Sequence, residues 1–139
     1  MVPVNYFAVL LAAVASMAIG FAWYSPMILG KQWIKEKGMT KEAMEKAKKE
    51  MGKWYGLSFV VSLITAFVLA HVMFLSTNYF HYQPIQIGLI TAFWMWLGFV
   101  MPVQVTATIF GNKNFKLFGI DTGYQLAALL TMGVVLGLF

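Results

Sequence analysis

Four apolar runs follow one another along the 139-residue chain and are separated by short polar segments. They extend approximately over residues 3–29, 55–76, 84–110 and 117–139. Each is long enough to cross the hydrocarbon layer of a bilayer as an α-helix, which needs about 20 residues. The alternation of apolar and polar residues that is typical of barrel strands is not visible. The pattern predicts an all-α membrane protein, a single domain over residues 1–139 with a four-transmembrane-helix bundle.

Charged residues are scarce and are concentrated between the first and second apolar runs. Only 11% of the residues are charged and 60% are hydrophobic, whereas a soluble domain carries roughly 25% charged residues. Eight of the 10 lysines lie within residues 31–53. Most of the formal charge of +5 therefore belongs to one loop, and we expect membrane lipids rather than nucleic acid as partners. The absence of cysteine excludes a disulfide scaffold and a thiolate metal site.

The placement of the lysines predicts the orientation of the chain in the membrane. Every lysine lies in the loop after the first run or in the loop after the third, which carries Lys113 and Lys116. Neither the N-terminus nor the loop over residues 77–83 carries one. By the positive-inside rule, both lysine loops face the cytoplasm. We therefore expect a multi-pass protein of the cell (inner) membrane with both termini outside and the charged loop cytoplasmic.

The charged segment also predicts an amphipathic helix over residues 40–54. Thr40 can cap its N-terminus, and apolar residues then recur on one face at helical spacing: Met44, Ala47, Met51 and Trp54. Such a helix would lie at the cytoplasmic interface, where it bends into the second span or continues it. It could sense anionic lipids or dock a partner, or it could be an anchor with a solvated outer face. We favour the anchor because mixed charge weakens a polybasic membrane contact.

Small residues spaced four apart predict where helices pack closely. The first run has the face Ala8, Ala12, Ser16 and Gly20, and the fourth run has the pairs Gly119 with Gly123 and Gly133 with Gly137. These faces could pack the bundle internally or join copies of the chain into a homo-oligomer. In the third run, Pro102 removes the backbone bond to the carbonyl of Gly98, so we expect a bend there.

Polar side chains are expected in two layers of the cytoplasmic half of the bundle. Counting inward from the cytoplasmic face, the first layer consists of Tyr24, Ser58, Thr108 and Asp121. About one turn deeper lie Trp23, Ser62, Gln104 and Gln125. Ionisable groups at membrane depth are functional candidates, so one hypothesis is a ligand-binding or proton-responsive site centred on Asp121. The other, which we favour, is an interhelical hydrogen-bond network in which Asp121 pairs with Lys116 or Lys113 or is stabilised near a helix start.

Catalytic and cofactor-binding patterns are missing from the sequence. It contains no Ser/His/Asp order of the kind found in catalytic triads, no metal-ligand cluster and no phosphate-binding glycine loop. His71 and His81 lie near the outer edge of the spans, where backbone groups or water can satisfy each of them. We therefore expect no catalytic residue, no metal and no cofactor, and we favour a protein that is not an enzyme.

Several short motifs are similar to those of a known family. The first run ends in Trp23-Tyr24-Ser25-Pro26 and is followed by Gly30-Lys31 and Trp33; the third ends in Ile109-Phe110-Gly111, and the fourth contains Ile120-Asp121-Thr122-Gly123-Tyr124. Over nearly the whole chain, the sequence resembles the domain of unknown function 1761 family of small bacterial and fungal membrane proteins. The resemblance implies the fold and the location but no activity. It also implies that asparagine is usual at position 121, which weakens Asp121 as an indispensable ionised group.

Three functions are compatible with these observations. The leading hypothesis is an integral membrane protein that binds a small apolar or amphipathic ligand, or a lipid, in the cytoplasmic half of the bundle. The first alternative is a small dimeric transporter or channel, although the first span has no acidic residue of the kind that small four-helix drug exporters use. The weaker alternative is a membrane enzyme that acts on lipid or quinone.

Overall fold

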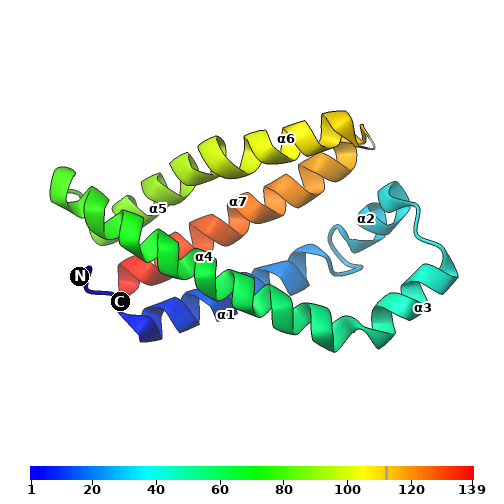
Figure 1. The fold of residues 1–139 in the computed structure, drawn as a ribbon, viewed down its shortest axis with the longest axis horizontal. Helices are drawn as coiled ribbons and strands as arrows, with labels where there is room; N and C mark the ends of the chain where they lie inside the picture. The colour runs from blue at the N-terminus through cyan, green and yellow to red at the C-terminus, as the bar shows by residue number, and fades with distance from the viewer. Residues whose placement is uncertain (112) are drawn as a thin grey trace.

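The computed structural model describes residues 1–111 and 113–139, and every regular element in these residues is helical. The elements are α1 (Tyr6–Trp23), α2 (Gly30–Lys37), α3 (Lys41–Lys49), α4 (Met51–Tyr79), α5 (Pro84–Met95), the π-helix η1 (Trp96–Val100), α6 (Met101–Phe110) and α7 (Phe115–Leu138). Figure 1 shows that the long helices run side by side and that α2 and α3 lie together at one end. The predicted all-helical fold is confirmed.

Four of these helices are long and apolar enough to cross a membrane, as the sequence predicts. They are α1, α4, the continuous run of α5, η1 and α6 over Pro84–Phe110, and α7. Both chain termini lie at the same end of the bundle (Figure 1), where the Asn5 Nδ2 donates to the Phe139 carbonyl oxygen at 3.4 Å. We call the opposite end, which holds α2, α3 and Lys113, the lysine end.

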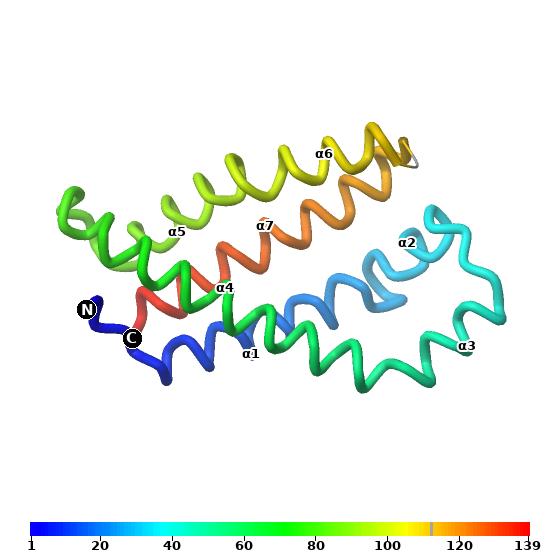
Figure 2. The backbone as a smooth tube through the Cα atoms, viewed as in Figure 1, coloured from blue at the N-terminus to red at the C-terminus, as the bar shows by residue number. Residues whose placement is uncertain are grey.

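Helix α7 occupies the middle of the bundle and packs along both α1 and α5, while α4 packs mainly on α1 and α5. Figure 2 shows α7 running between α1 and the α5–α6 rod. The buried core lies where these helices meet, and it includes Leu69, Ile87 and Leu129. Large apolar side chains such as Ile64 and Phe99 are exposed on the outside, which is expected where the surrounding medium is lipid.

The small-residue face of α1 packs against other helices, as predicted. Ala8, Ala12 and Ser16 are all at most 1% exposed. Further along the same face, a Cβ built on Gly20 would lie 3.1 Å from the Tyr124 hydroxyl of α7. These four residues therefore form contacts inside one chain.

The first apolar run does not form one helix over 3–29, because α1 ends at Trp23 and the chain then turns. Proline lacks an N–H and disfavours helical backbone at the preceding residue, so Pro26 stops the helix. The turn is closed by the Gly30 N–H, which donates to the Ser25 carbonyl oxygen at 2.9 Å. A Cβ on Gly30 would lie 2.8 Å from the Ser25 carbonyl carbon, so this position needs glycine. Helix α2, which the sequence analysis did not predict, begins here.

The expected amphipathic helix over residues 40–54 is not confirmed as a single element. Thr40 caps α3 as predicted, since its hydroxyl accepts a hydrogen bond from the Ala43 N–H at 3.2 Å. Helix α3 ends at Lys49, and Glu50, with φ −96° and ψ 3°, separates it from α4. The charged segment therefore contains two short helices, α2 and α3, joined to a long α4.

The third span changes its hydrogen-bonding pattern just before Pro102. Residues Trp96–Val100 form a π-helix, and the Met101 N–H donates to the Trp96 carbonyl five residues earlier. Proline at 102 cannot donate to the Gly98 carbonyl, and a π-turn is a known way to absorb such a defect in a helix. The predicted irregularity therefore takes the form of a π-helical turn.

Candidate ligand-binding site

The first turn of α7 fixes the position of α2 at the lysine end. Asn114 caps α7, because its Oδ1 accepts a hydrogen bond from the Leu117 N–H at 3.2 Å. Its Nδ2 donates to the Glu36 carbonyl oxygen of α2 at 2.9 Å. One asparagine side chain thus satisfies a free N–H of α7 and ties α2 to it.

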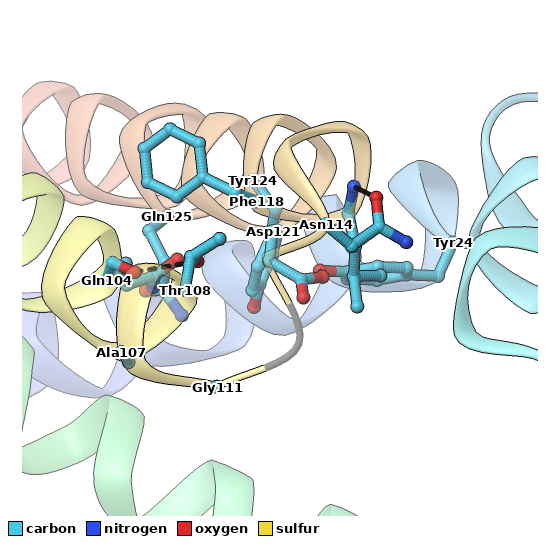
Figure 3. A pocket seen from close by; sticks show the side chains of 11 residues that line it. Tyr24, Gln104, Ala107, Thr108, Gly111, Asn114, Phe118, Asp121, Tyr124 and Gln125 are labelled. Atoms are coloured by element: carbon cyan, nitrogen blue, oxygen red, sulfur yellow. Dashed lines mark hydrogen bonds between the residues drawn. The ribbon is translucent and has the colours of Figure 1, made fainter.

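Asp121 lies one to two turns further along α7 and accepts hydrogen bonds from two aromatic side chains. The Tyr24 hydroxyl lies 2.6 Å from its Oδ1, and the Trp33 indole Nε1 lies 3.1 Å from the same atom. Figure 3 shows Asp121 pointing toward Tyr24. Burial, followed by the hydrogen bond to Asp121, raises the pKa of the Tyr24 hydroxyl, so tyrosine is the proton donor in this pair.

The last residue of α1 supplies a further donor to the same part of α7. The Trp23 Nε1 donates to the Ile120 carbonyl oxygen at 3.0 Å, one residue before Asp121. The Tyr24 ring meets Trp33 edge-on with a centroid separation of 5.6 Å and Tyr124 with one of 5.3 Å. The segment from Trp23 to Trp33 therefore wraps three aromatic donors around one turn of α7.

A second hydrogen-bonded group joins α7 to the third span. The Thr122 hydroxyl donates to the Gln104 Oε1 at 2.6 Å, and the Thr122 carbonyl accepts from the Trp96 Nε1 at 2.9 Å. The Thr108 hydroxyl donates to the backbone carbonyl of Gln104 at 2.8 Å. Because Gln104 uses its oxygen for Thr122, its amide N–H groups are the part that can serve a ligand.

A cavity of about 530 Å³ lies between α6, α7 and the end of α1 at the lysine end. Figure 3 shows that its walls come from these three segments. The lining residues are Tyr24, Gln104, Ala107, Thr108, Gly111, Asn114, Leu117, Phe118, Asp121, Tyr124 and Gln125. This volume falls in the range of roughly 300–1,000 Å³ that small-molecule sites occupy.

Besides Trp23, the two predicted layers contain seven residues, and five of these line this cavity: Tyr24, Gln104, Thr108, Asp121 and Gln125. The other two lie elsewhere. Ser58 lines a separate cavity between α1 and α4, and the Ser62 hydroxyl lies 4.0 Å from the Met17 sulfur of α1. The polar stripe of the second span therefore faces α1 rather than α7.

The partners of Asp121 differ from the expected ones. In the described part of the chain the carboxylate bonds to Tyr24 and Trp33, not to Lys113 or Lys116. The reason is that α2 folds back onto α7, which brings Trp33 to the carboxylate. Trp33 is part of the family-like motif in the sequence, but spacing alone could not show that α2 reverses direction.

The histidines lie away from this site. The His71 Nδ1 lies 2.8 Å from the Phe67 carbonyl oxygen, which is the backbone contact expected for an interfacial histidine. Among the described residues, no group of three or more His, Cys, Asp or Glu side chains could hold a metal ion. The chemistry of the site is therefore that of hydrogen bonds, one carboxylate and aromatic rings.

The structure thus has four helices that are long and apolar enough to cross a membrane, as in a polytopic α-helical membrane protein. The chain belongs to the family described as "Protein of unknown function (DUF1761)", which matches residues 7–137 and so confirms the resemblance found in its motifs. Comparison with curated proteins and with solved structures finds no match.

Proposed function

We propose that this protein binds a small amphipathic molecule in the cavity between α6, α7 and the end of α1, with a hydrogen-bond-donating head group on Asp121. The observation that carries the proposal is the way in which the two oxygens of the Asp121 carboxylate are hydrogen-bonded. Both bonds that it accepts from described residues go to Oδ1, which leaves Oδ2 for the cavity that Asp121 lines. A carboxylate with an open oxygen favours an amine or a hydroxyl group.

The rest of the lining supports an amphipathic ligand. The amides of Gln104 and Gln125 border the cavity together with Asp121, while Phe118 and Leu117 provide apolar wall. Pockets that combine an apolar wall with a few convergent polar groups are typical of small-molecule sites. A ligand with a polar head and a short apolar tail can use both parts.

The orientation in the membrane is part of the proposal. Lysines are confined to the lysine end, and the positive-inside rule places that end in the cytoplasm and both termini outside. The cavity would then lie in the cytoplasmic half of the inner membrane, within reach of the inner leaflet. Self-association through small-residue faces stays a prediction.

Binding can be tested with three ten-carbon amphiphiles that differ only in the head group: decylamine, decanol and decanoate. Each is added to the detergent-solubilised protein, and unfolding is followed by tryptophan fluorescence. We expect decylamine to raise the melting temperature by a few degrees at about ten times its dissociation constant. Decanoate should give no rise, since its anionic head would meet the Asp121 carboxylate.

The variant Asp121→Asn should lose the decylamine shift and stay folded, because the amide oxygen can accept the same two aromatic hydrogen bonds. Glu42→Gln is the matched control, since it removes one negative charge from an exposed position on α3, far along the chain from the cavity lining. Equal shifts in the wild type and in Asp121→Asn would contradict the proposal.

A further inference from the structure

A second cavity lies on the other side of Tyr24 and Tyr124, and its lining is of a different kind. It has a volume of about 720 Å³ and is bordered by α1, α2, α3 and the start of α4. Figures 1 and 2 show that α2 and α3 connect the lysine ends of α1 and α4 in a wide arch. The cavity is therefore bordered by the charged segment and by the two spans that it joins, and it is open to the surface, where Phe21, Met51 and Trp54 are exposed.

The wall of this cavity is mainly apolar and adaptable. It includes Met17, Phe21, Ile34, Met51 and Trp54. Methionine side chains are flexible and polarisable, so they can fit against chains of varying shape. An apolar lining of this extent favours a hydrocarbon chain as its occupant.

The charges at this cavity are positive. Lys37 is its one charged lining residue among those described, and the Lys37 ammonium lies 4.4 Å from the centroid of the Trp33 ring, which also lines the cavity. The Lys53 ammonium lies 5.3 Å from the Trp54 ring, but the Glu50 carboxylate accepts a hydrogen bond from the same indole. Lys37 is therefore the better anchor for an anion.

We infer that this second cavity binds the acyl chain of an anionic amphiphile, whose head group pairs with Lys37. An anionic lipid needs an apolar wall for its chain and a cation for its head group, and this cavity offers both, with Lys37 at its rim. A free fatty acid and an anionic phospholipid share this chemistry. The inference does not rest on the function proposed for the first cavity, because none of it involves Asp121.

The site can be tested with a sixteen-carbon fatty acid that carries a diazirine near the end of its chain. After photolysis of the full-length protein in nanodiscs, mass spectrometry locates the labelled peptides. We expect label on the segments around Met17 and Met51, and we expect unlabelled palmitate to compete. Hexadecanol, which has the same chain without the charge, should compete less well. Equal competition by hexadecanol, or label spread evenly over the lipid-exposed faces, would overturn the inference.

Two pairs of variants test separately the apolar cavity that holds the acyl chain and the Lys37 ammonium that pairs with the head group. Ser58→Phe places a large side chain in the cavity and should abolish the competed label. Val61→Phe introduces the same side chain on an exposed face of α4 and should leave the label unchanged. Lys37→Gln should weaken binding by roughly two- to fivefold, the range for an exposed ion pair, whereas Lys35→Gln on the same helix should leave it unchanged. Equal effects within either pair would refute the assignment.

Competition experiments distinguish a free fatty acid from an anionic phospholipid as the bound molecule. Competition by palmitate at low molar ratio identifies a free fatty acid, and competition by phosphatidylglycerol but not phosphatidylcholine identifies a membrane phospholipid. Either result supports an anionic chain site. Competition by phosphatidylcholine that equals that of phosphatidylglycerol would contradict it.

Discussion

A close approach of two backbones, between α5 and α7, gives a sharp test of the packing. Gly88 of α5 and Gly133 of α7 face each other, and both are buried. A Cβ built on Gly133 would lie 2.7 Å from the Gly88 carbonyl carbon, and one built on Gly88 would lie 2.6 Å from the Gly133 carbonyl carbon. Carbon atoms pack best at about 3.5–4.0 Å, so α5 and α7 must move apart by an appreciable fraction of an ångström to accept alanine.

The expected cost of Gly133→Ala follows from two opposing effects. Alanine favours the helix over glycine by roughly 0.8–1.0 kcal/mol. Overpacking a close contact costs typically about 1–3 kcal/mol, and here the obstacle is backbone, which cannot change rotamer. The difference between these two ranges is a net destabilisation of about 0–2 kcal/mol. We expect the upper part of this range because the obstacle is backbone, and a larger cost for Gly133→Leu.

Gly119→Ala is the control, because it lies on the same helix and a Cβ there would meet nothing within 4 Å. The assay is unfolding in mixed micelles of increasing sodium dodecyl sulfate content, followed by far-ultraviolet circular dichroism. Gly119→Ala should be neutral or slightly stabilising. If Gly133→Ala unfolds at the same detergent fraction as Gly119→Ala, the close approach of α5 and α7 is refuted.

Three further outcomes are expected. Gly30→Ala should lower the melting temperature in detergent and change the Trp33 environment, because a Cβ there collides with the turn backbone; an unchanged melt would count against this turn. Trp96→Phe should cost about 1 kcal/mol, the net value of the lost hydrogen bond to the Thr122 carbonyl, and full stability in the detergent titration would show that the bond contributes nothing. Glu45→Cys, in this cysteine-free chain, should react with an impermeant maleimide only after the cells are opened, whereas labelling of intact cells would reverse the proposed orientation.

The arrangement of the spans could be predicted because membrane insertion depends on length and apolar composition, which are local properties of the sequence. The buried face of Ala8, Ala12 and Ser16 was predictable for a similar reason, since close helix packing needs small side chains at a spacing of four. The contact between Gly133 and Gly88 could not be predicted in this way. A single glycine on α5 does not indicate which residue of α7 it faces until the register of the two helices is known.

The region from residues 24 to 50 was predicted less well. Pro26 is a signal for a helix end, but the apolar run continues past it. The first span was therefore expected to end at residue 29, whereas α1 ends at Trp23. The break between α3 and α4 falls at Glu50. Glutamate is a good helix former, unlike proline or glycine, so the residue type does not indicate a break there. Short helices in such a segment are fixed by tertiary contacts, here the bonds from Trp33 and Asn114 that tie α2 to α7.

The site itself could be predicted in part. Depth along the helices selected Gln104, Thr108, Asp121 and Gln125, because residues at equal depth on neighbouring helices can meet. Depth does not determine rotation about a helix axis, and for that reason Ser58 was expected beside Asp121 although it faces the second cavity.

The hydrogen bonds at Asp121 show what the negative charge adds. An asparagine side chain has nearly the same shape, and its Oδ1 could accept the bonds from Tyr24 and Trp33. The aromatic cluster therefore needs an acceptor at this position but not a carboxylate. What the carboxylate adds is a second acceptor oxygen and a charge, on a residue that lines the cavity. A charge costs free energy at membrane depth, so its presence where a neutral amide could hold the same cluster favours a cavity that receives a hydrogen-bond donor or a cation.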